Sequence, residues 1–459
     1  MKNRRSASIS RKKANGTSKD GLMAKIKSGE FKIAIYGLGH VGSPLASAWL
    51  RAGAHVIGVD KSPSVLENAR KGRTHVPEPG VDQAYQKGLR DKRFSVYDDP
   101  VKAAQDSSFK MICVPVLIDD SFNADLGPVR QVATAIGRGM KRGDTVSLNP
   151  TVPPGTTEDV VIPVLERESG MKAEQDFHMI YNPERIYEGR AIQDIEEGYP
   201  AVIAGAGPKS LEMGTKLYPM IFKKGVFRMQ SIKAAETEKL FEGVYRDVNI
   251  ALANEMARLC EKIGVNFWEA REAANSQPFC HIHKPGAGVG GACIPVYPQF
   301  VLHTANANKI ECNITRLGRT INDSMPEYCV EQALALVEAA DHPIVTVLGL
   351  AFRGGVSDTR LSPTYKIVEQ LRSRGVNDIR VHDPLVLRDP ALPGGVLLTS
   401  DLNHAVKGAN LVILAADHPE YRTLGSDKLG GMSVYDGRGI LDPMRFAQVR
   451  FASIGKPAS

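Results

Sequence analysis

The chain has 459 residues, of which 42% are hydrophobic and 24% charged, values typical of a globular protein of about three domains. Its longest apolar runs, such as residues 344–352, are much shorter than the roughly 20 residues of a membrane-spanning helix. The formal net charge of +7 lies entirely within residues 1–30, which hold nine basic and two acidic side chains. The short apolar runs predict no membrane span. Because the rest of the chain is neutral, we also expect no nucleic-acid partner.

Residues 1–30 are predicted to be a disordered basic tail, because they are rich in Ser, Lys and Gly and lack the apolar segment of a secretory signal. Such a tail is either a solubilising extension or a contact for a polyanion or a membrane surface. The six cysteines show no CxxC pairing, which indicates a reduced, cytoplasmic protein whose thiols stay free.

After this tail, strands and helices alternate along the chain. Residues 31–60 contain an apolar strand, a glycine turn, a helix and a second strand. Residues 109–116 form a further buried strand, and residues 143–161 a strand, a proline-rich loop and a helix. This alternation is typical of a parallel, doubly wound sheet, so we predict an N-terminal Rossmann-like domain over residues 31–225.

The stretch from 231 to 263 contains no proline and only Gly243 as a helix breaker, with apolar residues recurring every three or four positions. It predicts one long helix within a central helical domain over residues 226–335. A helix of that length between two α/β units commonly forms a spine or a dimer interface.

A second series of strands follows, each running into a polar or glycine-rich turn, and it predicts a C-terminal domain over residues 336–459. The expected strands are residues 344–352, 377–384, 409–418 and 433–439. The predicted fold class is therefore α/β, with two Rossmann-like, doubly wound parallel-sheet domains joined by a long central helix.

A glycine turn of the dinucleotide-binding type joins the first strand to the first helix, and Asp60 closes the next strand. The glycines let backbone N–H groups approach a pyrophosphate, while the carboxylate can accept from a ribose hydroxyl and would repel a 2′-phosphate. The pattern predicts NAD as the cofactor. The expected cofactor contacts here are Gly37, Leu38, Gly39, Val41, Gly42 and Asp60.

Cys293 follows Gly290 and Gly291 in the segment GVGGACIP. A lone cysteine is often a small buried hydrophobe, but these glycines would let another molecule approach the backbone next to the thiol. In a chain with a nicotinamide site, a thiolate can add to an aldehyde, and the resulting thiohemiacetal can lose a hydride to become a thioester. Such an enzyme would take an alcohol to an acid in two oxidations.

Two further groups of polar residues could take part in this chemistry. Glu184 and Glu188, in NPERIYEG, belong either to a solvated segment or to a site with a water-activating base and a substrate or nicotinamide contact. Lys239, followed on the same predicted helix by Arg246 and Asn249, is either a surface residue or stabilises an oxyanion.

Cys280, His281 and His283 supply side chains of the types that bind metals. A tetrahedral zinc site needs a second cluster to complete it, and the sequence offers none. We therefore predict that the protein uses no metal.

Ten motifs occur in the order typical of the nucleotide-sugar 6-dehydrogenases, a family that the chain resembles over roughly residues 31–459. They are GLGHVGSPLA, MICVP, NPTVPPGTT, NPERIYEGRAIQDI, AETEKL, GVGGACIP, GLAFRGGVSDTRLSP, VHDP, ADHPEY and DGRGILDP. The resemblance implies an N-terminal NAD domain, a central dimerising helix and a C-terminal domain that holds the nucleotide diphosphate. It also implies the four-electron oxidation of a sugar C6 alcohol to a carboxylate with two NAD.

The resemblance further implies a role for each matching residue. The catalytic residues would be Cys293 as nucleophile, Glu184 as hydrolytic base, Lys239 as oxyanion stabiliser and Thr151 as the residue that positions water. Glu188 would lie near the nicotinamide, and Arg360 would reach the cofactor across the domain interface. The expected substrate contacts are Arg185, Ile186, Arg246, Asn249, Gly290, Phe352 and Arg353.

Two segments narrow the implied substrate. The PER at 183–185 and the sequence YRDVNIALANE at 245–255 resemble the N-acetylhexosamine branch of the family. We therefore predict UDP-N-acetylmannosamine or UDP-N-acetylglucosamine as the substrate, with UDP-glucose as the alternative.

Three positions depart from the family pattern: Gly243 replaces a common asparagine, Tyr297 a common acid and Val116 a common threonine. A phenol, with a pKa of about 10, is a poor base at neutral pH, so water activation would fall to Lys239 or another group. These departures leave open a nucleotide-sugar-binding protein with impaired catalysis. A third possibility, a hydroxyacid dehydrogenase that transfers a single hydride, leaves Cys293 without a role.

Overall fold

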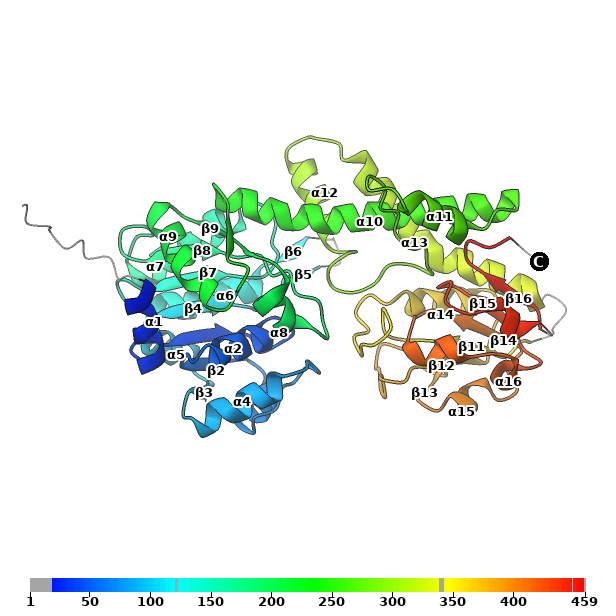
Figure 1. Ribbon diagram of the computed structural model, residues 1–459, viewed down its shortest axis with the longest axis horizontal. Helices are drawn as coiled ribbons and strands as arrows, with labels where there is room; N and C mark the ends of the chain where they lie inside the picture. Colours follow the sequence, from blue (N-terminus) through cyan, green and yellow to red (C-terminus); the bar gives the residue numbers. More distant parts are fainter. Residues whose placement is uncertain (1–18, 120–122, 338–341, 448, 458–459) are drawn as a thin grey trace, which may run out of the picture.

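The computed structural model describes residues 19–119, 123–337, 342–447 and 449–457. Two α/β units lie at opposite ends of the molecule, and the long helix α10 (Ile232–Ile263) runs along both of them (Figure 1). The predicted fold class is confirmed. In the described part of the chain, we find no helix with the length and apolar character needed to cross a membrane.

The N-terminal unit is built on an eight-stranded sheet in the order β10-β9-β8-β7-β4-β1-β2-β3. Its parallel strands are β1 (Ile33–Tyr36), β2 (Val56–Val59), β3 (Phe94–Tyr97), β4 (Phe109–Ile112), β7 (Thr145–Leu148) and β8 (His178–Tyr181). β9 (Ala201–Gly205) runs antiparallel to β8, and β10 (Val226–Arg228) runs parallel to β9. A separate hairpin pairs β5 (Leu117–Ile118) with β6 (Ala124–Asp125).

Helices cover both faces of this sheet, so its strands are buried on both sides. Ile33 and Ile35 of β1 belong to one core, while Ala34 and Tyr36 belong to the other. The helices of the unit are α2 (Gly42–Arg51), α3 (Pro63–Arg70), α4 (Val81–Arg90), α5 (Pro100–Asp106), α6 (Gly127–Gly139), α7 (Ile162–Ser169), α8 (Ala191–Gln193) and α9 (Pro208–Leu217), with the short helices η1 (Thr157–Val161), η2 (Asp194–Gly198) and η3 (Tyr218–Met220). Burial on both faces explains why these strands are continuous apolar runs in the sequence.

Two sequence predictions for this unit need correction. Residues 19–28 form helix α1 (Lys19–Ser28) instead of a disordered tail, because Leu22 and Ile26, one turn apart, are buried in a core of the N-terminal sheet. Residues 1–18 of the predicted tail lie outside the described residues. The boundary predicted at residue 225 is also too early, because β10 completes the N-terminal sheet.

The long central helix is confirmed at the predicted place. It starts at Ser231, whose Oγ accepts from the backbone N–H of Ala234 at 3.1 Å, and it ends at Gly264, which has a φ of +75°. α10 packs on β8 and β9 and on α13 (Asn313–Leu334), which in turn packs on the C-terminal sheet. The remaining helices of this region are α11 (Phe267–Asn275), α12 (Tyr297–Ala307) and η4 (Ala335–Val337).

The C-terminal unit is a six-stranded parallel sheet in the order β13-β12-β11-β14-β15-β16. Its strands are β11 (Val345–Leu348), β12 (Ile379–His382), β13 (Leu397–Thr399), β14 (Leu411–Leu414), β15 (Ser433–Asp436) and β16 (Phe451–Ser453). Its helices are α14 (Pro363–Ser373), α15 (Leu402–Val406) and α16 (Ser426–Leu429), with η5 (Pro419–Thr423) and η6 (Pro443–Phe446). In both units the strand order reverses beside the first strand, and ligands of such sheets bind at the carboxyl ends of the strands there.

Candidate active site between the two sheets

The glycine turn after β1 requires glycine at two of its positions. Gly37 has a φ of +97°, and a Cβ on Gly42 would lie 1.7 Å from the carbonyl oxygen of Gly37. A Cβ on Gly39, in contrast, would meet no protein atom within 4 Å, so the backbone there is open to a ligand. The turn leads into α2, whose first turn holds no acidic side chain and whose N-terminal end can receive a phosphate.

Asp60 is held beside this turn, at the carboxyl end of β2. One carboxylate oxygen accepts from the backbone N–H of Leu38 at 2.8 Å, and the other accepts from Ser62 at 2.9 Å. The predicted cofactor residues of this turn therefore lie together, with the carboxylate fixed close to the glycines. The arrangement fits a dinucleotide whose pyrophosphate lies at α2 and whose ribose reaches Asp60.

Cys293 lies in the loop before α12, where its side chain is exposed. Its carbonyl oxygen accepts from the backbone N–H groups of Val296 (3.1 Å) and Tyr297 (3.0 Å), so the first turn of α12 starts at the cysteine. This turn brings the side chains of residues 293 and 297 to the same face of the helix.

The neighbouring glycines have a packing role in addition to the predicted approach of a substrate. A Cβ on Gly290 would lie 2.6 Å from the carbonyl oxygen of Leu361, and a Cβ on Gly291 would lie 3.0 Å from the ring of Phe352. The backbone N–H of Gly291 also donates to the carbonyl oxygen of Arg360 at 2.9 Å. The glycines thus let the cysteine loop pack closely against the C-terminal unit.

Lys239 and Thr151 converge on the ring of Tyr297, next to Cys293. Lys239 is only 8% exposed, and its Nζ lies 5.8 Å from the centroid of the Tyr297 ring. Thr151 donates from Oγ1 to the Tyr297 hydroxyl at 3.0 Å. Glu184 is close enough to Tyr297 for its charge to act on the phenol, so all four residues with predicted catalytic roles surround this ring.

Burial raises the pKa of Glu184 to about 7, although the charge of Lys239 and the backbone N–H groups of Ile186 and Arg185 favour the carboxylate. The Ile186 N–H donates directly to the Glu184 carboxylate. A carboxyl group with a pKa near the working pH is well suited to accept a proton from water.

Arg185 is held by α10. Its Nε lies 2.8 Å from Oε1 of Glu242, and its guanidinium lies 4.9 Å from the centroid of the Tyr199 ring. The other oxygen of Glu242 lies 3.4 Å from Nζ of Lys239. Burial and the charge of Glu242 also raise the pKa of Glu238 to about 7. Lys239, Glu238 and Glu242 of α10 thus form, with Arg185 from the segment after β8, a cluster of two basic and two acidic side chains.

Arg246 and Asn249 lie further along α10. They are seven and ten residues past Lys239, about 10 to 15 Å along the helix. Asn249 uses its amide to hold a loop, donating to the carbonyl oxygen of His281 and accepting from the N–H of His283, both at 2.9 Å. The structure thus gives Asn249 a structural contact in addition to its predicted role, while Arg246 is exposed.

Glu188 links the two units. Its carboxylate lies 3.2 Å from Nδ1 of His40 in the glycine turn, and its carbonyl oxygen accepts from Arg353 at 2.9 Å. Arg353 also lies over the ring of Tyr187, 4.3 Å from its centroid, and Arg360 pairs with Asp358 of its own loop. The predicted cofactor residue Glu188 therefore contacts both the glycine turn and a predicted substrate residue.

Three known domain models match the chain in order. All three describe the UDP-glucose/GDP-mannose dehydrogenase family: its NAD binding domain matches residues 31–222, its central domain residues 233–324 and its UDP binding domain residues 346–443. The chain belongs to this family. It is an NAD-dependent nucleotide-sugar dehydrogenase, which sets aside the hydroxyacid-dehydrogenase alternative.

Relatives of the dehydrogenase match over nearly its whole length. It is 35% identical to the UDP-N-acetyl-D-mannosamine dehydrogenase of Pyrococcus horikoshii over 421 residues, 89% of this chain and 96% of the relative. It is 32% identical to the NDP-N-acetyl-D-galactosaminuronic acid dehydrogenase of Ralstonia nicotianae, over 90% of this chain and 97% of the relative.

Solved structures agree with this assignment. The structure of the Pyrococcus horikoshii UDP-D-ManNAc dehydrogenase superposes with a TM-score of 0.85 at 34% identity and covers 94% of this chain and 100% of its own. That of a UDP-glucose dehydrogenase from Pyrobaculum islandicum gives a TM-score of 0.86 at 28% identity and covers 93% and 98%. Structural likeness alone therefore does not separate the two sugar types.

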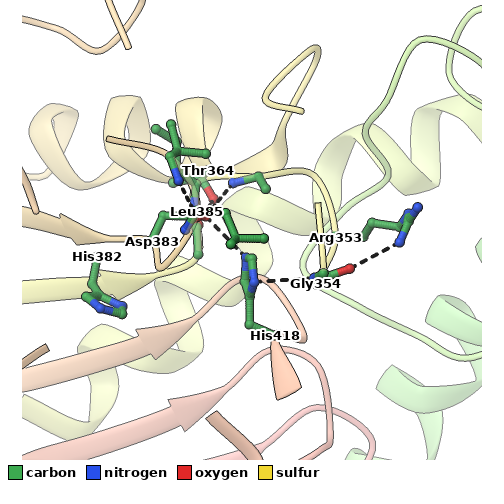
Figure 2. Close-up of polar contacts among 12 residues, drawn as sticks. Arg353, Gly354, Thr364, His382, Asp383, Leu385 and His418 are labelled. Carbon is green, nitrogen blue, oxygen red and sulfur yellow. Dashed lines mark hydrogen bonds and ion pairs between the residues drawn. The ribbon is translucent and has the colours of Figure 1, made fainter. Parts of the chain in front are cut away.

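A buried cluster that the sequence analysis did not single out holds the loop with Phe352 and Arg353 (Figure 2). Asp383 follows β12, and one of its oxygens accepts from the N–H groups of Leu350 (2.8 Å) and Ala351 (2.9 Å). The same oxygen lies 3.2 Å from Nε2 of the fully buried His418.

The contacts of the two ring nitrogens of His418 also define its tautomer. Its Nδ1 accepts from the N–H of Gly355 at 3.3 Å, so in the neutral ring the proton is on Nε2, facing Asp383. Burial alone would raise the pKa of Asp383, but the contact with His418 and the backbone N–H donors lower it below its usual value. The sequence signal for this cluster lay in VHDP and ADHPEY, two family motifs to which no role was assigned.

Replacement of Asp383 by alanine should lower the free energy of unfolding by about 3–5 kcal/mol, because it leaves buried donors of the loop at 350–355 and of His418 without an acceptor. Denaturant unfolding measures the loss, and the KM for the nucleotide sugar should rise because the loop that carries Arg353 is freed. Asp378→Ala, which removes an exposed partner of Arg380, is the control and should cost less than about 1 kcal/mol. Equal stability of the two variants would contradict the role of the cluster.

Proposed function

We propose that the dehydrogenase oxidises the C6 alcohol of UDP-N-acetylmannosamine or UDP-N-acetylglucosamine to the carboxylate, through a thiohemiacetal and a thioester on Cys293. The observation that carries the proposal is the exposed thiol in a loop between the two sheets, with Lys239, Glu184 and Thr151 gathered beside it. The names of the relatives from Pyrococcus and Ralstonia support an N-acetylated sugar.

UDP-glucose is the second candidate substrate. It is favoured by one observation, the close structural likeness to the UDP-glucose dehydrogenase of Pyrobaculum islandicum. The two classes differ in the group on C2 of the sugar, so a direct comparison of substrates separates them.

In the proposed reaction each residue acts through its position. The glycine turn and Asp60 would hold NAD, which would supply the hydride acceptor for each of the two oxidations. Cys293 attacks the C6 aldehyde, and its sulfur then carries the acyl group of the thioester. Glu184 accepts a proton from the attacking water, while the positive charge of Lys239 stabilises the oxyanion. Arg185, Phe352 and Arg353 are proposed to hold the nucleotide sugar.

We propose that two copies of the dehydrogenase pair through the central helices. α10 exposes a row of large apolar side chains on one face, and α13 adds two near its start. They are Phe241, Tyr245, Leu252, Leu259 and Ile263 on α10 and Ile314 and Leu317 on α13. An apolar surface of this kind is typical of an interface between subunits.

The first test of the proposed function is the amount of NADH formed per nucleotide sugar consumed, with UDP-N-acetylmannosamine, UDP-N-acetylglucosamine, UDP-glucose and GDP-mannose in turn. Two NADH per sugar with an N-acetylated substrate would support the whole proposal. Two NADH with UDP-glucose alone would keep the thiol mechanism and change the substrate. Binding without NADH for all four would support the impaired-catalysis alternative.

A further inference from the structure

Gly243 and Tyr297 occupy one space in the structure. Gly243 lies on α10, and a Cβ at this position would be 2.5 Å from Cδ2 and 2.8 Å from Cβ of Tyr297. Real Cβ atoms do not approach other atoms so closely, so any larger residue at position 243 would displace the Tyr297 ring. The absence of a side chain at 243 is therefore the condition for the phenol at 297 to enter the site.

The Tyr297 hydroxyl lies between two residues of the proposed mechanism. It accepts from Oγ1 of Thr151 at 3.0 Å, and it lies close enough to Cys293 for a charge on the sulfur to act on the phenol. Because the Tyr297 hydroxyl oxygen accepts the hydrogen bond from Thr151, its own O–H remains free to donate to the sulfur. The first turn of α12 fixes this geometry, since the Tyr297 N–H donates to the Cys293 carbonyl oxygen at 3.0 Å.

The surroundings keep this phenol protonated. Burial, followed by the charge of the Cys293 thiolate, raises the pKa of Tyr297 well above its usual value. Lys239 faces the ring, with Nζ 5.8 Å from its centroid, and its ammonium pairs with Glu242. A phenol in this environment is a hydrogen-bond donor and not a base.

We propose that Tyr297 is a catalytic residue that donates its O–H first to the Cys293 thiolate and then to the oxyanion on C6 of the bound sugar, in a space that Gly243 keeps free. This inference rests on the proposed function. Gly243 and Tyr297, which replace an asparagine and an acid common in the family, would then together supply a hydrogen-bond donor to the site.

The steps balance without a net proton transfer to Tyr297. The sulfur forms a bond to the aldehyde carbon, and the C=O electron pair moves to oxygen, which receives the phenolic hydrogen bond. The C–H electron pair then leaves as hydride to NAD, the C=O bond re-forms and the thioester results. Water adds to the thioester and gives up its proton to Glu184, and the C–S bond breaks. The released thiolate again accepts from the phenol.

Tyr297→Phe tests the proposal, because it keeps the ring against Gly243 and removes only the hydroxyl. We expect a roughly 100-fold fall in kcat with little change in KM, the effect typical of losing one oxyanion donor. The rate of alkylation of Cys293 by iodoacetamide, followed by mass spectrometry of its peptide, should also change, because the sulfur has lost a hydrogen-bond donor. Tyr97→Phe is the matched control, since its hydroxyl contacts Asp106 near the edge strand β3, and it should behave as wild type.

Gly243→Ala tests the shared space by a second route. Its methyl group must displace the Tyr297 ring, so this variant should show the same loss of kcat and the same change in alkylation, although glycine carries no functional group. Alanine favours the helix over glycine, so thermal unfolding can show that α10 still folds.

The outcomes separate this proposal from the proposed function. Wild-type kcat and an unchanged alkylation profile in Tyr297→Phe would overturn the donor role, even if the wild-type enzyme forms two NADH per sugar. If the wild-type enzyme oxidises none of the four sugars, the alkylation profile decides alone. A change in that profile would support the contact with Cys293, and no change would refute it.

Discussion

Cys293→Ala should form no acid product, and the rate of the second NADH should fall roughly 10⁴-fold or more. The reason is that Cys293 carries the acyl intermediate, and its described neighbours cannot replace it, since Lys239 pairs with Glu242 and Tyr297 is a donor. Stopped-flow absorbance of NADH and chromatography of the sugar products measure the two oxidations separately.

The control for this variant is Cys312→Ala, which removes a partly buried thiol at the start of α13. It should retain two NADH per sugar. Nucleotide-sugar affinity of Cys293→Ala, measured by calorimetry, should stay near the wild-type value because Cys293 is exposed and supports no core. Two NADH per sugar from Cys293→Ala would refute the covalent mechanism while leaving the family assignment intact.

The fold follows from the sequence where local signals and burial agree. Gly42 must be glycine because a side chain there would clash with Gly37, only five residues earlier. The turn could therefore be predicted from the spacing of its glycines alone. The long helix could be predicted for the same reason, since Ser231 and Gly264 are ordinary helix ends. The antiparallel β9 and the strand β10 gave no such signal, because strand direction depends on the path of the chain.

Contacts between distant segments could not be predicted in the same way. In the sequence, Gly243 and Tyr297 are two unrelated departures from the family pattern. In the structure, the Tyr297 ring of α12 fills the space that a side chain at position 243 of α10 would need. Asp383 and His418 follow different strands, and only the sheet order places β12 and β14 on either side of β11 so that the two side chains meet. Helix α1 was missed because its two buried residues stand among basic ones.

Glu184→Gln should slow steady-state turnover roughly 10²- to 10⁴-fold, because the hydrolytic water loses its base while both hydride transfers remain possible. We therefore expect a burst of about two NADH per active site, followed by slow release of the acid. Mass spectrometry of the quenched enzyme should detect the acyl group on Cys293. A variant without a burst would show that Glu184 acts before the thioester forms.

The pH dependence of the wild-type enzyme gives an independent test of the same residue. The pKa of Glu184 is about 7, and only the ionised carboxylate can accept a proton. Turnover limited by hydrolysis should therefore fall tenfold per pH unit below about 7 and level off above it. Glu238 also has a pKa of about 7, so Glu238→Gln is the necessary comparison. If Glu184 is the base, Glu238→Gln retains the acidic limb of the profile and Glu184→Gln loses it. The opposite result would assign the titration to the carboxyl pair on α10.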